Sequence, residues 1–197
     1  MRVSKQQAAE NREGVLDAAA KLFRERGFDG VGVDAVMAEA GLTHGGFYKS
    51  FASKDALVAE ACTRAFRQID DFWGGYAGRP GKGLAAAVGW YLSRRHLDSP
   101  GDGCVLAALA ADAGRRGPTA RAVFSVGLER WVGYLVRLLP GASEARRRDA
   151  ALARIATMVG AVAIARALDD QSLADEILAA ARIAVLADYA VPEGQSR

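Results

Sequence analysis

The sequence is poor in cysteine, in proline and in long apolar runs. Its 197 residues include two cysteines and five prolines, and charges interrupt every run that approaches the roughly 20 apolar residues of a membrane span. Cys62 and Cys104 lie far apart, which excludes a disulfide framework and a paired Cys/His zinc site. The N-terminus lacks the apolar core of a secretion signal. We therefore expect a cytoplasmic protein with no metal, no cofactor and no membrane partner.

An excess of one charge sign is also lacking. The formal net charge is +3, and residues 1–55 hold eight Lys/Arg and eight Asp/Glu, so any nucleic-acid binding must be argued from placed residues. No Ser/His/Asp set, paired carboxylates or phosphate loop is visible. Arg94, Arg95 and His96 are compatible with an anion site, but a solvated helix end is the simpler interpretation. We expect that the protein is not an enzyme.

Runs of β-branched residues are scarce, while alanine and leucine are abundant, which favours an all-α fold. Apolar residues recur at helical spacing, as in Val15, Ala18, Ala19, Leu22 and Phe23. Together with glycine, proline and capping signals, this spacing predicts about nine helices, at 11–26, 33–40, 44–51, 54–75, 83–97, 104–114, 118–139, 144–168 and 171–189.

The first three expected helices form a helix-turn-helix pattern, in which the last helix lies in the DNA major groove. Gly27 and Gly41 are placed to end the first two helices, and Thr43 and Ser53 are placed to cap the helices that follow them.

The stretch "GLTHGGFYKSF" (41–51) carries two adjacent glycines where the first turn of its helix should be. Each interior glycine costs a helix about 1 kcal/mol relative to alanine. Short side chains at Gly45 and Gly46 leave room for close approach to DNA. Polar groups on Thr43, Tyr48, Lys49 and Ser50 offer hydrogen-bond donors, and Phe47 and Phe51, four residues apart, should face inward.

The run "GFDGVGVDAVMAEAGLTHGGFYKSFASKDALVAEA" (27–61) resembles the DNA-binding domain of TetR-family transcriptional regulators, with matching spacing over about 10–61. The resemblance implies an N-terminal three-helix DNA-binding domain at 1–55 and a C-terminal helical ligand-binding and dimerisation domain at 56–197. It implies phosphate contacts from Arg12, Tyr48 and Lys54. It also places Thr43, His44, Gly45 and Gly46 at base edges with Lys49 nearby, and makes Ser50 a further DNA-binding position.

The sequence departs from the family pattern at three places. Val31 and Gly32 stand where members often carry Ser or Thr, Ser50 stands where histidine is common, and Gly46 often has a side chain. The interpretation of the pattern as three packed helices without DNA binding is the alternative. Tyr48 as a core aromatic, and Lys49 and Lys54 as solvated lysines, are the local alternatives.

The last two helices are expected, by resemblance, to form a homodimer interface. Residues 150–168 are more apolar than a surface helix should be. The interface residues that we expect are Ile155, Val159, Val162, Ile177, Leu178, Ala181 and Val185. Burial of these helices within one chain is the alternative.

Large side chains gather between the DNA-binding domain expected at 1–55 (the head) and these helices, where the family holds a small-molecule effector. Phe66, Trp73, Trp90, Tyr91, Cys104, Phe124 and Trp131 are the expected pocket residues, although aromatics at helical spacing are more often core. Cys104 as a sensor of oxidants or electrophiles is a further possibility, opposed by its apolar surroundings.

The sequence thus predicts a dimeric repressor that is released from a palindromic double-stranded DNA operator by a small, largely apolar effector or by modification of Cys104. A DNA-binding regulator without an effector, or an activator, is the alternative. A small all-helical enzyme is a distant third.

Overall fold

The computed structural model describes residues 4–77, 83–140 and 143–187, and these ranges contain ten α-helices, two short 3-10 helices and no strand. The chain forms two compact units. Unit 1 comprises Met1–Gln68 and Pro100–Ser125, and unit 2 comprises Ile69–Ser99 and Val126–Arg197. The all-α prediction is confirmed.

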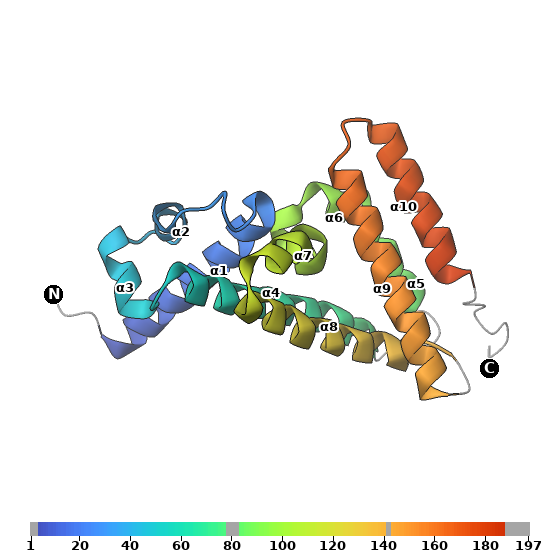
Figure 1. Ribbon diagram of the computed structural model, residues 1–197, viewed down its shortest axis with the longest axis horizontal. Coiled ribbons are helices and arrows are strands. Elements are labelled where there is room, and N and C mark those ends of the chain that lie inside the picture. Colours follow the sequence, from blue (N-terminus) through green and yellow to red (C-terminus); the bar gives the residue numbers. More distant parts are fainter. Residues whose placement is uncertain (1–3, 78–82, 141–142, 188–197) are drawn as a thin grey trace. The chain divides into compact units, whose positions relative to one another are not determined.

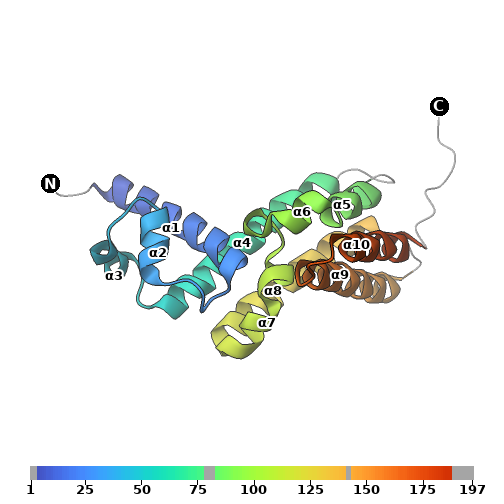
Figure 2. The same ribbon diagram turned by 90° about the horizontal axis from the view of Figure 1, so that it is seen from above.

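Unit 1 contains the helix-turn-helix segment. Helices α1 (Lys5–Arg26), α2 (Val33–Glu39) and α3 (Phe47–Ser50) gather beside the first part of α4 (Lys54–Ala77) (Figure 2). The 3-10 helix η1 (His44–Gly46) precedes α3, and η2 (Pro100–Asp102) and α7 (Val105–Arg116) complete the unit with the start of α8 (Pro118–Leu138).

Helix α1 begins earlier than its apolar spacing indicates. The sequence predicts a start near residue 11, yet the helix starts at Lys5, where the side chain of Ser4 caps it by accepting a hydrogen bond from the Gln7 amide (3.1 Å). The apolar stripe of α1 is buried as predicted, and Phe23 packs edge-on against Phe28 with 5.6 Å between ring centroids.

The turn between α2 and η1 is closed by Gly41. Its φ of 69° is a left-handed conformation that favours glycine. The Gly41 amide donates to the carbonyl of Ala38 (3.0 Å), and the Leu42 amide donates to that of Met37 (2.8 Å). These two bonds satisfy carbonyls that the helix end leaves open, so the predicted stop at Gly41 is confirmed.

Unit 2 is built around three large rings. Its helices are the rest of α4 and α8 with α5 (Gly83–Tyr91), α6 (Arg94–Asp98), α9 (Glu144–Arg166) and α10 (Gln171–Leu186). Trp73, Tyr91 and Trp131 are each at most 2% exposed. The Trp131 ring centroid lies 5.5 Å from that of Trp73 and 5.5 Å from that of Tyr91, a spacing typical of packed aromatic side chains.

The single helix predicted at 83–97 is wrong, because the chain breaks between α5 and α6. Ser93 caps α6 by accepting from the His96 amide (3.3 Å). Two arginines satisfy carbonyls around the break. Arg166 donates to the carbonyls of His96 (2.6 Å) and Leu97 (3.0 Å), and Arg182 donates to that of Leu92 (2.6 Å). The α9 and α10 side chains therefore stabilise this corner.

His96 is buried at the same corner. Its Nδ1 donates to the carbonyl of Tyr91 (2.6 Å), and its ring stacks on Trp90 with 5.1 Å between centroids. Burial lowers the pKa of His96 to about 4, because the charged form loses its water. The imidazole is therefore neutral at neutral pH and acts as a packed donor, which disfavours the anion-site interpretation of 94–96.

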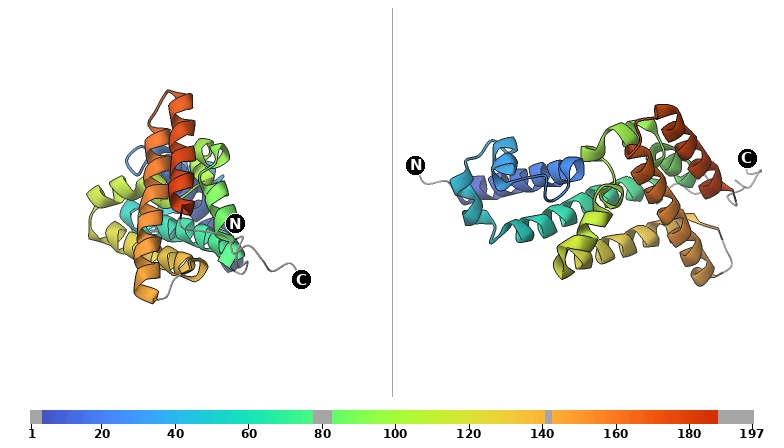
Figure 3. Two further views of the ribbon diagram at one scale, coloured as in Figure 1. Left: turned by 90° about the vertical axis from the view of Figure 1, so that its right-hand side faces the viewer. Right: turned by 45° about the horizontal axis from the view of Figure 1, so that its top comes forward.

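Helices α9 and α10 lie side by side as an antiparallel pair (Figures 1 and 3). Asp170 caps α10 by accepting from the amides of Ser172 (2.9 Å) and Leu173 (3.1 Å). The residues buried along this pair are mostly small or branched: Ala151, Ile155, Met158, Ala161, Val162, Ala165, Ala174, Leu178, Ala181 and Val185.

The remaining predicted helices agree with the structure to within a few residues. Part of the chain lies outside the described residues. This part includes residues of the expected breaks before the helices at 83–97 and 144–168, the end of the last predicted helix beyond 187, and the C-terminal tail. In the described part of the chain, no helix combines the length and apolar character needed to cross a membrane.

Candidate nucleic-acid interface

The third helix of the head begins as a tight turn. The α-helix predicted at 44–51 is a 3-10 turn over His44–Gly46 followed by α3, with the Gly46 amide donating to the carbonyl of Thr43 (3.0 Å). Thr43 occupies the cap position with extended backbone but its side chain makes no capping hydrogen bond, which corrects the predicted cap. Adjacent glycines disfavour a regular α-turn, so the chain uses the tighter form.

Two phenylalanines anchor this segment from inside. Phe47 is fully buried, Phe51 is 3% exposed, and their rings stack with 5.6 Å between centroids. The inward orientation predicted for both is confirmed. Between them, Tyr48 is 70% exposed and touches Phe47 only with its ring edge (5.0 Å between centroids). Its interpretation as a core aromatic is wrong, and its hydroxyl is accessible to a partner.

Among the described residues, no contact requires glycine at position 45. A Cβ atom built there meets none of their atoms within 4 Å, and one at Gly46 meets Met37 Cε at 3.4 Å. Neither residue has a positive φ, in contrast to Gly27, Gly41 and Gly117. The described part of the fold therefore has room for a Cβ at Gly45, and at Gly46 one would lie in close contact with Met37.

Polar residues surround a hollow on this side of the head. Thr43, His44, Gly45 and Lys49 are exposed, and Gly46 and Ser50 are half-buried. The hollow, of about 650 Å³, lies between α1 and the helix-turn-helix segment and includes Asn11, Thr43, Gly45, Lys49 and Ser50 in its lining. Thr43, Gly45, Gly46, Lys49 and Ser50 thus line one hollow, and His44 is not part of its lining.

Two of the predicted contact residues have intramolecular partners that sequence reasoning missed. His44 Nδ1 pairs with Asp34 at the start of α2. Arg12 pairs with Glu60 of α4, and its guanidinium carbon lies 4.8 Å from the Phe51 ring centroid. The two pairs join residues 10 and 48 positions apart, so a local sequence pattern does not predict them. Arg12 therefore links α1 to α4, and any phosphate contact must share it with Glu60.

Lys54 begins α4, where a helix offers unpaired amides. The Ser53 side chain accepts from the Ala56 amide (3.1 Å), which confirms the predicted cap. Lys54 is half-buried, and the amides of the first turn and the helix dipole favour an anion beside it. At the start of α2, Gly32 occupies the cap position without a side-chain hydrogen bond, and Val31 is 1% exposed. Neither residue has a hydroxyl that could bind a phosphate.

The expected pocket residues separate into two groups. Trp73, Trp90, Tyr91 and Trp131 belong to unit 2, whereas Phe66, Cys104 and Phe124 belong to unit 1. In unit 1, Phe66 meets Phe124 edge-on with 5.3 Å between ring centroids.

Both cysteines are buried, and neither forms a disulfide bond. Cys104 is 3% exposed, and its side chain does not cap α7. Burial raises the pKa of Cys62 to about 12, an effect larger than the opposing influence of Arg24 and Arg116. Cys62 is therefore an unreactive thiol. Among the residues that the structure describes, no group of three or more His, Cys, Asp or Glu side chains is arranged to hold a metal ion.

Five of the seven residues expected at a dimer interface are packed inside the single chain. Ile155, Val162, Leu178, Ala181 and Val185 are at most 8% exposed, and Val159 and Ile177 are half-buried. The outer side of the α9–α10 pair instead exposes a different set of small and apolar residues: Leu152, Ala153, Ala156, Ala163, Ile164, Leu173, Ala180, Ile183 and Ala184.

Comparison with known proteins gives matches to the head. Residues 15–61 match the model of the bacterial regulatory proteins of the tetR family. YdgC of Bacillus subtilis (strain 168), named an uncharacterized HTH-type transcriptional regulator, is 41% identical over 59 residues, which is 30% of each chain. YerO of the same organism, similarly named, is 34% identical over 53 residues, 27% of this chain and 18% of its own. The matched stretch is less than a third of either relative.

Solved structures extend the likeness to the whole fold. The reduced form of E. coli NemR superimposes with a TM-score of 0.79 at 21% identity, covering 94% of this chain and 100% of that one. SCO4454, a TetR-family transcriptional regulator from Streptomyces coelicolor, superimposes with a TM-score of 0.70 at 26% identity, covering 92% and 96%.

The third helix of the head carries glycines, is exposed, and rests on buried aromatic side chains. Together with the two helices before it, it defines a helix-turn-helix protein whose C-terminal part is all-helical in the described residues. The matched segment and the shared fold assign it further. Residues 15–61 match the tetR family of bacterial regulatory proteins, and the fold is that of solved TetR-family regulators.

Proposed function

We propose that the protein is a DNA-binding transcriptional regulator that inserts η1 and α3 into the major groove. One observation carries the proposal: the helix-turn-helix segment within the matched residues 15–61 presents its third helix to solvent, with Gly45 and Tyr48 exposed over the buried Phe47. A helix that approaches DNA needs short side chains where its backbone meets the duplex, and a surface turn selected for stability alone does not.

The surrounding residues supply the polar contacts. Tyr48 and Lys54 are proposed to contact phosphates, the latter with the α4 amides. Thr43, His44 and Lys49 are proposed to face base edges. Because Gly46 carries no side chain, we expect the preference for a particular DNA sequence to depend on these three residues and on DNA shape.

Binding to the DNA upstream of the protein's own gene tests this function. We expect a complex that survives an excess of unrelated competitor DNA and weakens steeply as salt rises, because phosphate contacts release counterions. Fluorescence anisotropy with labelled duplexes at several salt concentrations measures both properties. Absence of binding at low salt, or equal affinity for unrelated DNA, contradicts the proposal.

A homodimer is proposed to form through the outer side of α9 and α10. This surface presents Ile164 (55% exposed), Leu173 (43%) and Ile183 (73%) among alanines. Small residues allow close approach of helices, and apolar ones gain from burial. The interface therefore shifts to the opposite side from the residues first expected, which the chain itself buries. A two-fold dimer presents two heads to a palindromic operator.

The variant Ile164→Glu tests this interface. We expect the wild-type protein to have a mass near twice that of the 20.8 kDa chain, and the variant to shift toward the monomer at micromolar concentration, because a charge is buried without a partner. Light scattering coupled to size-exclusion chromatography measures the mass. Val126→Glu on α8 is the matched control, since Val126 is 60% exposed and lies outside this surface. A dimeric Ile164→Glu protein excludes the interface.

The protein is further proposed to be a repressor that a small, largely apolar effector releases from DNA. The ring cluster of unit 2 supports this, since Trp131 Nε1 is buried without a hydrogen-bond partner in the described part of the chain. An effector with a hydrogen-bond acceptor would satisfy that donor. The burial of Cys104 favours this route over cysteine modification. An effector acts only by binding one conformation more tightly than the other.

A further inference from the structure

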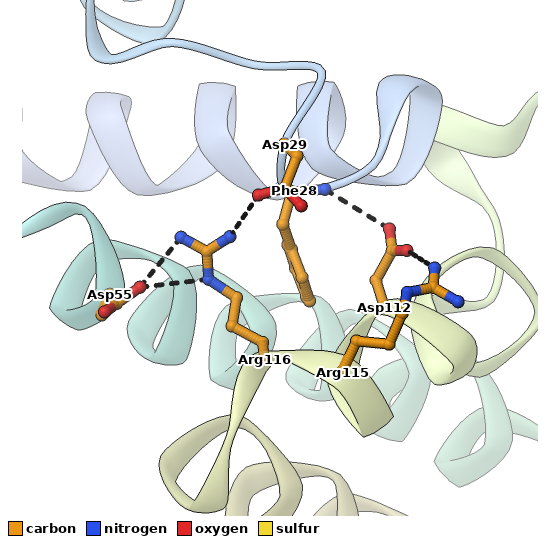
Figure 4. Close-up of polar contacts among 6 residues, drawn as sticks. All are labelled: Phe28, Asp29, Asp55, Asp112, Arg115 and Arg116. Carbon is orange, nitrogen blue, oxygen red and sulfur yellow. Dashed lines mark hydrogen bonds and ion pairs between the residues drawn. The ribbon is translucent and has the colours of Figure 1, made fainter.

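A cluster of charged residues joins α7 to the DNA-binding part of unit 1. Arg116, the last residue of α7, donates from Nη1 to Asp29 (2.8 Å) in the turn after α1. It also donates from Nε (3.1 Å) and Nη2 (2.8 Å) to Asp55 in the first turn of α4. Figure 4 shows this guanidinium between the two carboxylates. One side chain therefore ties together three segments of the unit.

The burial of Arg116 distinguishes it from an ordinary surface cation. Its side chain is 18% exposed, and its guanidinium carbon lies 5.5 Å from the centroid of the buried Phe28 ring. Isolated surface ion pairs contribute little to stability. A guanidinium that packs on a ring and binds two carboxylates has a more defined geometry than the guanidinium of an isolated surface pair.

The neighbouring residues hold α7 in place independently of Arg116. Asp112 accepts from the Phe28 amide (3.4 Å), and Arg115 pairs with Asp112 within the same helix. A Cβ on Gly27 would lie 2.8 Å from Asp112 Oδ2, so the two segments approach closely. Loss of Arg116 alone should therefore leave α7 packed on the turn after α1.

Asp55 has an unfavourable position for a DNA-binding helix. It follows Lys54 directly, in the turn whose amides are proposed to bind a phosphate, and its carboxylate is 76% exposed. A carboxylate near a helix N-terminus competes with an anionic ligand for the same positive field. The two Arg116 hydrogen bonds neutralise this charge and hold the carboxylate toward α7.

We propose that Arg116 is a positioning residue for DNA binding, which holds the N-terminus of α4 in place and neutralises Asp55 beside the bound phosphate. This inference rests on the proposed function. It needs no contact between Arg116 and DNA, because Arg116 acts through Asp55.

The variant Arg116→Gln tests this role. We expect its affinity for the upstream duplex to fall about tenfold, while its melting temperature stays within a few degrees of the wild type because Asp112 still binds the Phe28 amide. Arg115→Gln is the matched control. It removes the same charge from the adjacent position, and the Arg115 side chain is 72% exposed and pairs with Asp112 rather than with Asp29 or Asp55. We expect its affinity to change less than twofold.

A double-mutant cycle separates positioning from general stability. In the Asp55→Asn background no carboxylate needs to be neutralised, so Arg116→Gln should change the affinity less than threefold there. Equal losses with Asp55 and with Asp55→Asn, or equal losses in Arg116→Gln and Arg115→Gln, overturn the inference. Wild-type protein that binds no DNA overturns the proposed function instead, before any variant is compared.

Discussion

Gly45→Leu should abolish operator binding and leave the folded protein intact. In the described part of the chain, a Cβ at this position meets no atom within 4 Å, so the fold has room for the leucine, which in the proposed complex lies where η1 meets DNA. We expect the dissociation constant to rise on the order of a hundredfold or more, which corresponds to about 3 kcal/mol. Anisotropy titration of the upstream duplex measures the loss.

The stability of this variant should equal or slightly exceed that of the wild type, because leucine favours helical backbone over glycine. Gly45→Ala is the graded companion, and its single methyl group should cost less affinity. Gly75→Leu is the matched control, since Gly75 is exposed on α4 and also has no neighbour within 4 Å. Wild-type affinity in Gly45→Leu would exclude η1 from the DNA interface.

Local chemistry made much of the head predictable. The stops at Gly27 and Gly41, the cap at Ser53 and the inward faces of Phe47 and Phe51 each depend on residues within a few positions of one another. The match over residues 15–61 covers the same region. The assignment of residues 43–49 to a DNA-facing surface came from the resemblance, and of these residues Thr43, Gly45 and Lys49 are exposed and line one hollow.

Contacts between distant segments could not be predicted in the same way. The corner between α5 and α6 depends on Arg166 and Arg182, whose partners lie 70 and 90 positions away. Arg116 and Asp55 are 61 positions apart. On α9 and α10, small apolar residues cover both sides, so periodicity does not show which side faces the rest of the chain. The dimer residues were accordingly assigned to the inner side.

Phe47→Ala should cause the largest loss of stability in the head. Phe47 is fully buried, stacks on Phe51 and meets the ring edge of Tyr48. Removing a buried phenylalanine costs about 3–5 kcal/mol, because the transfer energy is lost and a cavity remains. Since α3 has only four residues, it depends on this anchor more than a long helix does. Urea unfolding followed by circular dichroism measures the change, and DNA binding should fall with it.

Tyr48→Ala is the matched comparison, because the two aromatics are adjacent and differ in exposure. Tyr48 is 70% exposed, so its loss should change stability by at most about 0.5 kcal/mol. If its hydroxyl binds a phosphate, affinity for both specific and unrelated DNA should fall about tenfold, equivalent to about 1.4 kcal/mol. If Phe47→Ala loses stability, the Phe47 ring supports the fold. If Tyr48→Ala loses affinity without losing stability, the Tyr48 side chain contacts DNA. Equal unfolding in both variants would make Tyr48 a structural residue and remove it from the interface.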